Sequence, residues 1–210
     1  MDRFELYKDW LARQPHKPAE IVAGLHTDFV EVRMADGGMD AVPAGRLAAG
    51  GYDEHRAIYD NAAFGAGIEG VEPRTIHLGI DIFAPAGTPV FAPRPGRVHS
   101  FRDNAAALDY GPTIILEHAL TPDLTVWTLY GHLSRDSLSG LRHGQAIAGG
   151  KEIARLGSDA VNGGWLPHLH FQLILDIGDA RGDFPGVFRK SERERWRRVC
   201  PDPRAFLQIA

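Results

Sequence analysis

The 210-residue sequence is poor in the features that mark several large classes of protein. Its single cysteine, Cys200, cannot form an internal disulfide, which excludes a disulfide scaffold. Its formal net charge of -4 leaves no excess of positive charge, the usual mark of a chain that binds nucleic acid. No apolar run approaches the roughly 20 residues of a membrane-spanning helix, so no membrane span is expected.

The N-terminus also lacks the uninterrupted apolar core of a secretory signal, because charged side chains interrupt residues 1–13. The chain as written is therefore expected to be cytoplasmic. Removal of a leader would instead place it in the periplasm or outside the cell. The pattern makes no prediction of the oligomeric state.

The first third of the chain, residues 1–72, is expected to form an N-terminal appendage that leans on the main domain. Residues 2–13 carry apolar side chains at helical spacing, whereas residues 28–34 alternate as a strand does. A turn signal at 36–38 then predicts a hairpin. The remainder is irregular, with a short helix expected near 53–64.

Short β-rich runs dominate residues 73–178, where Gly, Pro, Asn and Asp separate them and almost no helical period occurs. These runs are 80–83, 88–91, 96–98, 113–118, 124–130 and 169–175. Their near-regular spacing predicts a mainly β fold, an antiparallel sandwich or barrel-like domain. Residues 179–210 are expected to pack on this domain as a tail that contains a short charged helix.

Histidines and one carboxylate recur at the ends of these runs. His77 and Asp81 lie four residues apart in one apolar segment, and His132 follows another. His168 and His170, at positions i and i+2, would project to the same face of a strand. Three nitrogen and oxygen ligands with a fourth position free are what a catalytic zinc site requires. The spacing therefore predicts that some of these side chains converge on one ion.

Taken together, these motifs resemble the LytM/lysostaphin-type zinc endopeptidases, whose pattern is His-x-x-x-Asp, a further histidine and then His-x-His. The flanking residues match as well: Gly79, Tyr130, Leu133 and Phe171. The resemblance covers about residues 74–176, roughly half of the chain. It implies a β fold of the duplicated hybrid motif type and a peptidase activity.

The same resemblance implies a role for each residue of the motifs. His77, Asp81 and His170 would be the ligands of one Zn²⁺ ion, and His132 and His168 the catalytic histidines. A bound zinc ion activates water and polarises a carbonyl, while the two histidines share proton transfer and stabilisation of the oxyanion. Which of the two acts as the base stays open. No other cofactor is implied.

Four further residues are candidates for contacts with substrate: Tyr52, Arg56, Asn162 and Trp165. Tyr52 and Arg56 belong to a charged cluster in the N-terminal segment. This segment could either complete the substrate groove or block the cleft. The other two lie in an approach to the His-x-His motif that departs from the Ser-Thr-Gly-Pro of many family members, so specificity is expected to differ. Two interpretations of Gln172 stay open: its side chain supports a metal ligand by a hydrogen bond, or it lies at an exposed position of the strand.

The family-typical reaction is hydrolysis of a peptide bond in the peptidoglycan cross-link or stem peptide. The strings around His77 and His168 look most similar to a branch whose domain also occurs beside phosphotransferase-like and aminotransferase-like domains. With no export signal, this leaves open a zinc-binding module of a cytoplasmic metabolic system that binds a small ligand or processes a small peptide or amide. A phosphocarrier-like domain is disfavoured, because a phosphohistidine site needs no metal-binding carboxylate such as Asp81.

Overall fold

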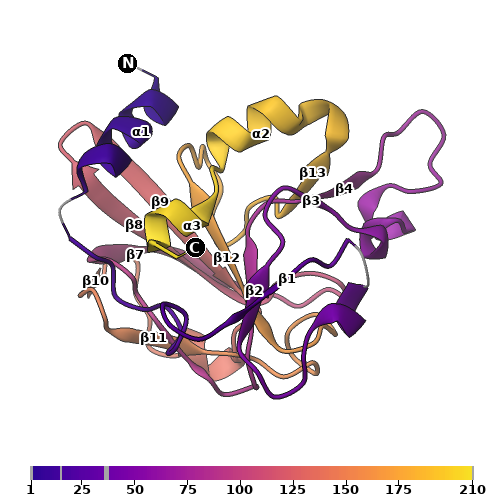
Figure 1. The fold of residues 1–210 in the computed structure, drawn as a ribbon, viewed down its shortest axis with the longest axis horizontal. Coiled ribbons are helices and arrows are strands. Elements are labelled where there is room, and N and C mark those ends of the chain that lie inside the picture. The colour runs from indigo at the N-terminus through magenta and orange to yellow at the C-terminus, as the bar shows by residue number, and fades with distance from the viewer. Residues whose placement is uncertain (1, 15, 36–37, 210) are drawn as a thin grey trace.

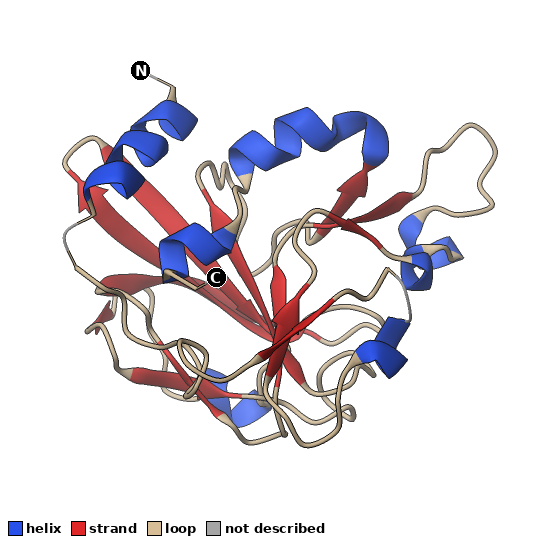
Figure 2. Ribbon diagram, viewed as in Figure 1, coloured by secondary structure: helices blue, strands red, loops and turns tan. Residues whose placement is uncertain are grey.

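An eight-stranded sheet forms the centre of the computed structural model, which describes residues 2–14, 16–35 and 38–209 (Figures 1 and 2). In sheet order its strands are β1 (Val30–Val32), β2 (Ala48–Gly50), β5 (Ile80–Phe83), β12 (His168–Ile174), β9 (Leu124–Gly131), β8 (Gly111–Thr121), β7 (Gly96–Asn104) and β10 (Ala146–Ile147). All neighbours are antiparallel except β1 and β2, which pair in parallel.

Two smaller sheets and three short helices complete the described structure. One sheet pairs β11 (Glu152–Arg155) with β6 (Pro89–Phe91), and the other has the order β13 (Val187–Arg189), β4 (Arg74–His77) and β3 (Glu54–His55). The helices are α1 (Arg3–Arg13), α2 (Arg193–Val199) and α3 (Pro203–Leu207). Single 3₁₀ turns occur at Gly38–Ala41, Ala57–Tyr59, Ala62–Phe64, Arg135–Leu138 and Lys190–Glu192. In the described part of the chain, no helix has both the length and the apolar character to span a bilayer.

Strand β12 separates the apolar core from the polar side of the sheet. Successive side chains of a strand point to opposite faces. Its odd-numbered side chains join the largest apolar cluster: Leu169, Phe171 and Leu173. Its even-numbered side chains include three buried polar groups: His168, His170 and Gln172. The strand is buried throughout because α1 and α3 add apolar side chains to the core on one face, while β4 and β13 cover the other.

The mainly β prediction is confirmed, with short helices near both ends of the chain. Because β1 pairs with β2 in parallel, these two strands do not form the hairpin that was predicted after residues 28–34. The predicted turn at 36–38 lies mostly outside the described residues. In place of the short helix expected near 53–64, the chain forms β3 and two separate 3₁₀ turns.

The N-terminal segment shares the sheets of the main domain. β2 extends the large sheet beyond β5, with Gly50 opposite Asp81. β3 extends the three-stranded sheet beyond β4, with Glu54 opposite His77. Residues 48–55 are therefore hydrogen-bonded to both of the strands that carry the His-x-x-x-Asp motif.

His118, outside the predicted motifs, is a fully buried polar group of β8. Its Nδ1 lies 2.8 Å from the carbonyl oxygen of Pro95, and its Nε2 lies 2.8 Å from the hydroxyl of Thr128. Burial lowers the pKa of this imidazole from 6.5 to about 4. Between these two pH values the unfolded chain binds the proton and the folded chain does not, so acid favours unfolding.

We therefore predict that the free energy of unfolding falls as the pH is lowered from about 6.5 to about 4. The stabilisation linked to neutral His118 is fully present above pH 6.5. It is lost as the pH falls to about 4, and it amounts to roughly 3 kcal/mol of the free energy of unfolding. Denaturant titrations across this range should show a shallower pH dependence for His118→Gln than for the wild type. The same substitution at exposed His16 is the control. An unchanged slope in His118→Gln would contradict the prediction.

Candidate metal centre

Backbone pairing of three strands brings the predicted metal ligands together. In the register of β12 against β5, His170 lies directly opposite Asp81. His77 ends β4, and a tight connection through Gly79 leads from it into β5. A Cβ atom at Gly79 would lie 2.6 Å from the carbonyl oxygen of Phe171 and 2.8 Å from Cε1 of His170. Only glycine lets this connection pass so close to the His170 ring.

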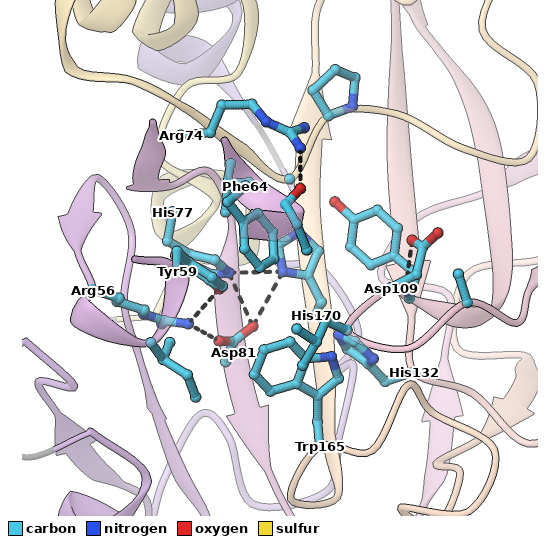
Figure 3. Close-up of a pocket in the computed structure, with 18 of the residues that line it drawn as sticks. Arg56, Tyr59, Phe64, Arg74, His77, Asp81, Asp109, His132, Trp165 and His170 are labelled. Carbon is cyan, nitrogen blue, oxygen red and sulfur yellow. Dashed lines mark hydrogen bonds and ion pairs between the residues drawn. The ribbon is translucent and has the colours of Figure 1, made fainter. Parts of the chain in front are cut away.

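Three potential ligand atoms face one another in the resulting cluster (Figure 3). Nε2 of His77 lies 2.9 Å from Nδ1 of His170 and 3.3 Å from Oδ1 of Asp81. Nδ1 of His170 lies 3.2 Å from the same oxygen. Ligands bonded at about 2.0–2.1 Å around a tetrahedral ion lie roughly 3.3 Å apart, so these separations suit a single metal ion.

Hydrogen bonds on the far side of each ring determine which nitrogen atoms carry lone pairs. Nδ1 of His77 donates to the carbonyl oxygen of Gly51 at 2.8 Å. Nε2 of His170 donates to Oε1 of Gln172 at 3.0 Å, because the amide nitrogen of that glutamine donates to Pro185. Burial lowers the pKa of His77 to about 4, so its ring is neutral at pH 7. Two nitrogen lone pairs and a carboxylate oxygen thus meet with no proton to share, an arrangement that fits a bound cation.

His132 and His168 lie side by side next to this cluster, with ring centroids 4.2 Å apart. His132 follows β9 with a φ of 63°, in the left-handed region that side chains of this size rarely adopt, and this conformation turns it out of the strand direction. Nδ1 of His132 donates to the carbonyl oxygen of Asn162 at 2.8 Å, and Nδ1 of His168 donates to that of Leu166 at 2.6 Å. Both Nε2 atoms therefore carry lone pairs and can accept a proton. Burial lowers the pKa of both rings.

The five motif residues line one cleft with a volume of about 450 Å³. One part of its lining is apolar: Met39, Ile58, Tyr59, Phe64, Trp165 and Val187. Charged side chains line it as well: Arg74, Asp109 and Asp183. A cavity of this size admits a short peptide and gives it access to an ion and to two proton acceptors.

The four candidate substrate residues lie in different surroundings. Trp165 and Arg56 line the cleft, although the Arg56 side chain is buried against the metal cluster. Asn162 is fully buried and binds the backbone of Trp165 through both side-chain atoms, which shapes the loop before β12. Tyr52 donates its hydroxyl to the carbonyl of Cys200 at 2.8 Å and lines a second hollow of the molecule instead.

Two residues of the centre were not expected from the sequence. The carbonyl of Gly51 orients His77, but a backbone carbonyl leaves no signal in an amino-acid pattern. The ring of Tyr59 stacks on that of His77 with centroids 6.3 Å apart and planes inclined by 19°. In the sequence, the only indication that Tyr59 belongs to the site was its position three residues after Arg56, in a charged cluster.

Comparisons with known proteins agree with this site. A family model described as peptidase family M23 matches residues 75–180, which is just over half of the chain and includes all five motif residues. The DD-carboxypeptidase/endopeptidase Mpg of Neisseria meningitidis serogroup B is 38% identical over 101 residues, which are 48% of this chain and 20% of that protein. The chain thus matches about a fifth of the length of the curated relatives.

Solved structures of peptidases are also similar. The catalytic domain of the antimicrobial peptidase lysostaphin from Staphylococcus simulans is 26% identical, with 69% of this chain and 86% of that chain covered and a TM-score of 0.44. A zinc-containing peptidase from Vibrio cholerae is 30% identical, with 48% and 28% covered and a TM-score of 0.38. The comparisons give no support to the expected likeness to a branch joined to phosphotransferase-like and aminotransferase-like domains.

We predict that Gln172→Leu weakens metal binding about 10- to 100-fold, because His170 loses the acceptor that holds its tautomer and ring orientation. Competition with a chromogenic chelator would measure the change in affinity for a divalent metal ion. Gln145→Leu, at an exposed position away from the cluster, is the matched control. Wild-type affinity in Gln172→Leu would show that the hydrogen bond to His170 is dispensable.

Proposed function

Because this chain belongs to peptidase family M23, a family of metallopeptidases, we propose that it is a zinc-dependent endopeptidase that hydrolyses a peptide bond of peptidoglycan. One observation carries the proposal. Two imidazole nitrogen atoms and a carboxylate oxygen face one point, and two further imidazoles beside them present nitrogen atoms that can accept protons. This combination provides both parts of metal-assisted hydrolysis.

In this proposal Nε2 of His77, Oδ1 of Asp81 and Nδ1 of His170 hold one Zn²⁺ ion. One carboxylate and two neutral rings leave the site with a net positive charge and, in tetrahedral coordination, one open position. When bound, the ion supplies Lewis acidity to the scissile carbonyl and to the attacking water. The protein supplies a buried cleft in which bulk water does not screen these charges.

His132 and His168 then divide the transfer of the proton and the stabilisation of the oxyanion. A side chain that removes a proton from water must be neutral at the working pH. Burial provides this condition, because it lowers the pKa of both imidazoles. Their Nδ1 atoms are committed to backbone carbonyls, so Nε2 is the atom that exchanges the proton with water and with the leaving amine.

A peptidoglycan cross-link or stem peptide is the proposed substrate. The name of the Neisseria relative, a DD-carboxypeptidase/endopeptidase, supports this choice. The family match at residues 75–180 contains the metal cluster and both histidines. The apolar lining around Trp165 and Val187 would receive the side chains of such a peptide. With this substrate the protein would act outside the cytoplasmic membrane.

We predict that His132→Ala retains one zinc ion per chain but lowers kcat about 10²- to 10⁴-fold, because the metal ligands remain and a proton acceptor is lost. Asp81→Ala should instead lose the zinc. Metal analysis would measure occupancy, and mass spectrometry of digested peptidoglycan would measure loss of cross-linked fragments or release of terminal D-alanine. His16→Ala, at an exposed position, is the matched control.

Three outcomes would contradict the assignment at different points. Unchanged turnover in His132→Ala would remove the proposed proton acceptor, and full zinc occupancy in Asp81→Ala would remove a proposed ligand. A zinc-loaded wild type that leaves peptidoglycan intact but cleaves small peptides or amides would favour the alternative of a small-substrate module in a cytoplasmic system.

A further inference from the structure

The two carboxylate oxygens of Asp81 have different partners. Oδ1 faces the imidazoles of His77 and His170. It also lies 3.6 Å from Nε2 of His168. Oδ2 instead accepts a hydrogen bond from Nη1 of Arg56 at 2.6 Å. In Figure 3 the guanidinium of Arg56 lies to the left of the Asp81 carboxylate, and the rings of His77 and His170 lie above it. The side chains of Arg56 and Asp81 are each only 2% exposed, so water does not compete for this ion pair.

Arg56 is itself held in place by three further contacts. Its Nε donates to Oε2 of Glu54 at 2.9 Å, and its Nη1 lies 3.3 Å from the hydroxyl of Tyr59. Its backbone nitrogen donates to the carbonyl of Thr75, in β4, at 3.0 Å. A long side chain that is fixed in this way can orient a neighbouring carboxylate without paying further entropy for each contact.

The same short segment also holds His77. Gly51 accepts the hydrogen bond from the ring, and the backbone nitrogen of Asp53 donates to the carbonyl of His77 at 3.0 Å. Gly51 has a φ of 97°, and a Cβ atom there would lie 1.8 Å from Nη2 of Arg56, so glycine is required for this packing. Residues 51–59 therefore contact two of the three potential ligands, although they precede the family match at 75–180.

We propose that Arg56 is a positioning residue of the metal centre, which holds Oδ2 of Asp81 so that only Oδ1 is presented to the metal. The inference rests on the proposed function, in that His77, Asp81 and His170 are taken as the metal ligands. Carboxylates can bind a cation through one oxygen or through both. With Oδ2 bound to the guanidinium, the carboxylate occupies one coordination position, and another is left for the substrate.

Arg56 has two electrostatic effects that a purely structural residue would not have. Its positive charge offsets part of the negative charge of the Asp81 carboxylate, so the site attracts a metal cation less strongly. For the same reason, a bound metal ion keeps more of its positive charge and withdraws electrons more strongly from its other ligands. Loss of this charge should therefore strengthen metal binding, or leave it unchanged, while it slows the reaction. Loss of a residue that only supports the fold would weaken both.

Arg56 is not placed to bind the substrate, although it borders the cleft. Its Nη1 faces Asp81 and Tyr59, its Nε faces Glu54, and its Nη2 packs against Gly51. All three nitrogen atoms are therefore turned towards the protein. A change at this position should alter kcat and leave KM nearly as it is.

The test compares Arg56→Gln, Arg56→Lys and the wild-type protein by three measurements. The Zn²⁺ dissociation constant is measured by chelator competition, kcat and KM are measured on a soluble cross-linked muropeptide, and the visible spectrum is recorded for the Co²⁺-substituted protein. Arg46→Gln, which removes an exposed arginine that pairs with Asp28, is the matched control. Since Arg56→Gln leaves Glu54 buried without its partner, the double variant Glu54→Gln/Arg56→Gln removes the whole pair.

We expect Arg56→Gln to bind Zn²⁺ at least as tightly as the wild type, with kcat lowered about 10-fold or more and KM within about twofold. The Co²⁺ absorption should weaken, because a second carboxylate oxygen raises the coordination number. Arg56→Lys, which keeps the charge, should recover part of kcat. The double variant should show the same Zn²⁺ affinity, kcat and Co²⁺ spectrum as Arg56→Gln. If Arg56→Gln does not fold, the double variant takes its place in all three measurements.

A loss of Zn²⁺ affinity in parallel with kcat would overturn the inference, and so would an unchanged kcat with an unchanged Co²⁺ spectrum. Failure of the proposed function is distinguishable from both. A wild-type protein that binds zinc but cleaves no muropeptide would contradict the proposed reaction, while the metal affinity and the Co²⁺ spectrum would still report on Arg56. A wild-type protein that binds no zinc would contradict the proposed function and this inference together.

Discussion

The antiparallel pairing of β12 with β5 is the constraint on which the rest of the site depends. Its register places His170 opposite Asp81, and the alternation of side chains along β12 puts His168 and Gln172 on the same face. A shift of one residue would turn all three into the apolar core and bring leucine and phenylalanine to the site. The buried odd-numbered side chains of β12 prevent that shift, so core packing and site geometry are coupled.

Four buried imidazoles are accommodated by one recurring arrangement. Each ring donates one N–H to a neutral oxygen at its outer edge, and the other nitrogen is left with a lone pair that faces inward. The acceptors are the carbonyls of Gly51, Asn162 and Leu166 and the side-chain oxygen of Gln172. Because these acceptors carry no charge, they do not stabilise an imidazolium, and burial lowers the pKa of His77, His132 and His168. The same hydrogen bonds fix ring orientation, which suits both metal binding and proton transfer.

Charge in the cleft is balanced across a chain of contacts rather than within one pair. Burial alone would raise the pKa of the Asp81 carboxyl, but this pKa lies well below its usual range. With the rings neutral, the guanidinium of Arg56 is the charged group that stabilises the carboxylate. Glu54 offsets the charge of Arg56 on its far side. This chain of contacts begins in the N-terminal segment, so residues before the family match form part of the centre.

Strand periodicity and turn residues were enough to predict the mainly β fold. The histidine and carboxylate motifs carried the resemblance that indicated the family and the five residues that meet in the cleft. The sequence also indicated the helices near both ends. Three features became visible only in the folded chain: β1 and β2 join the large sheet, Asn162 and Tyr52 turn away from the cleft, and Gly51, Tyr59 and Arg56 surround the ligands. These features depend on contacts between segments far apart in the chain, and on backbone carbonyls that every residue type possesses. Side-chain identity alone therefore carries no record of them.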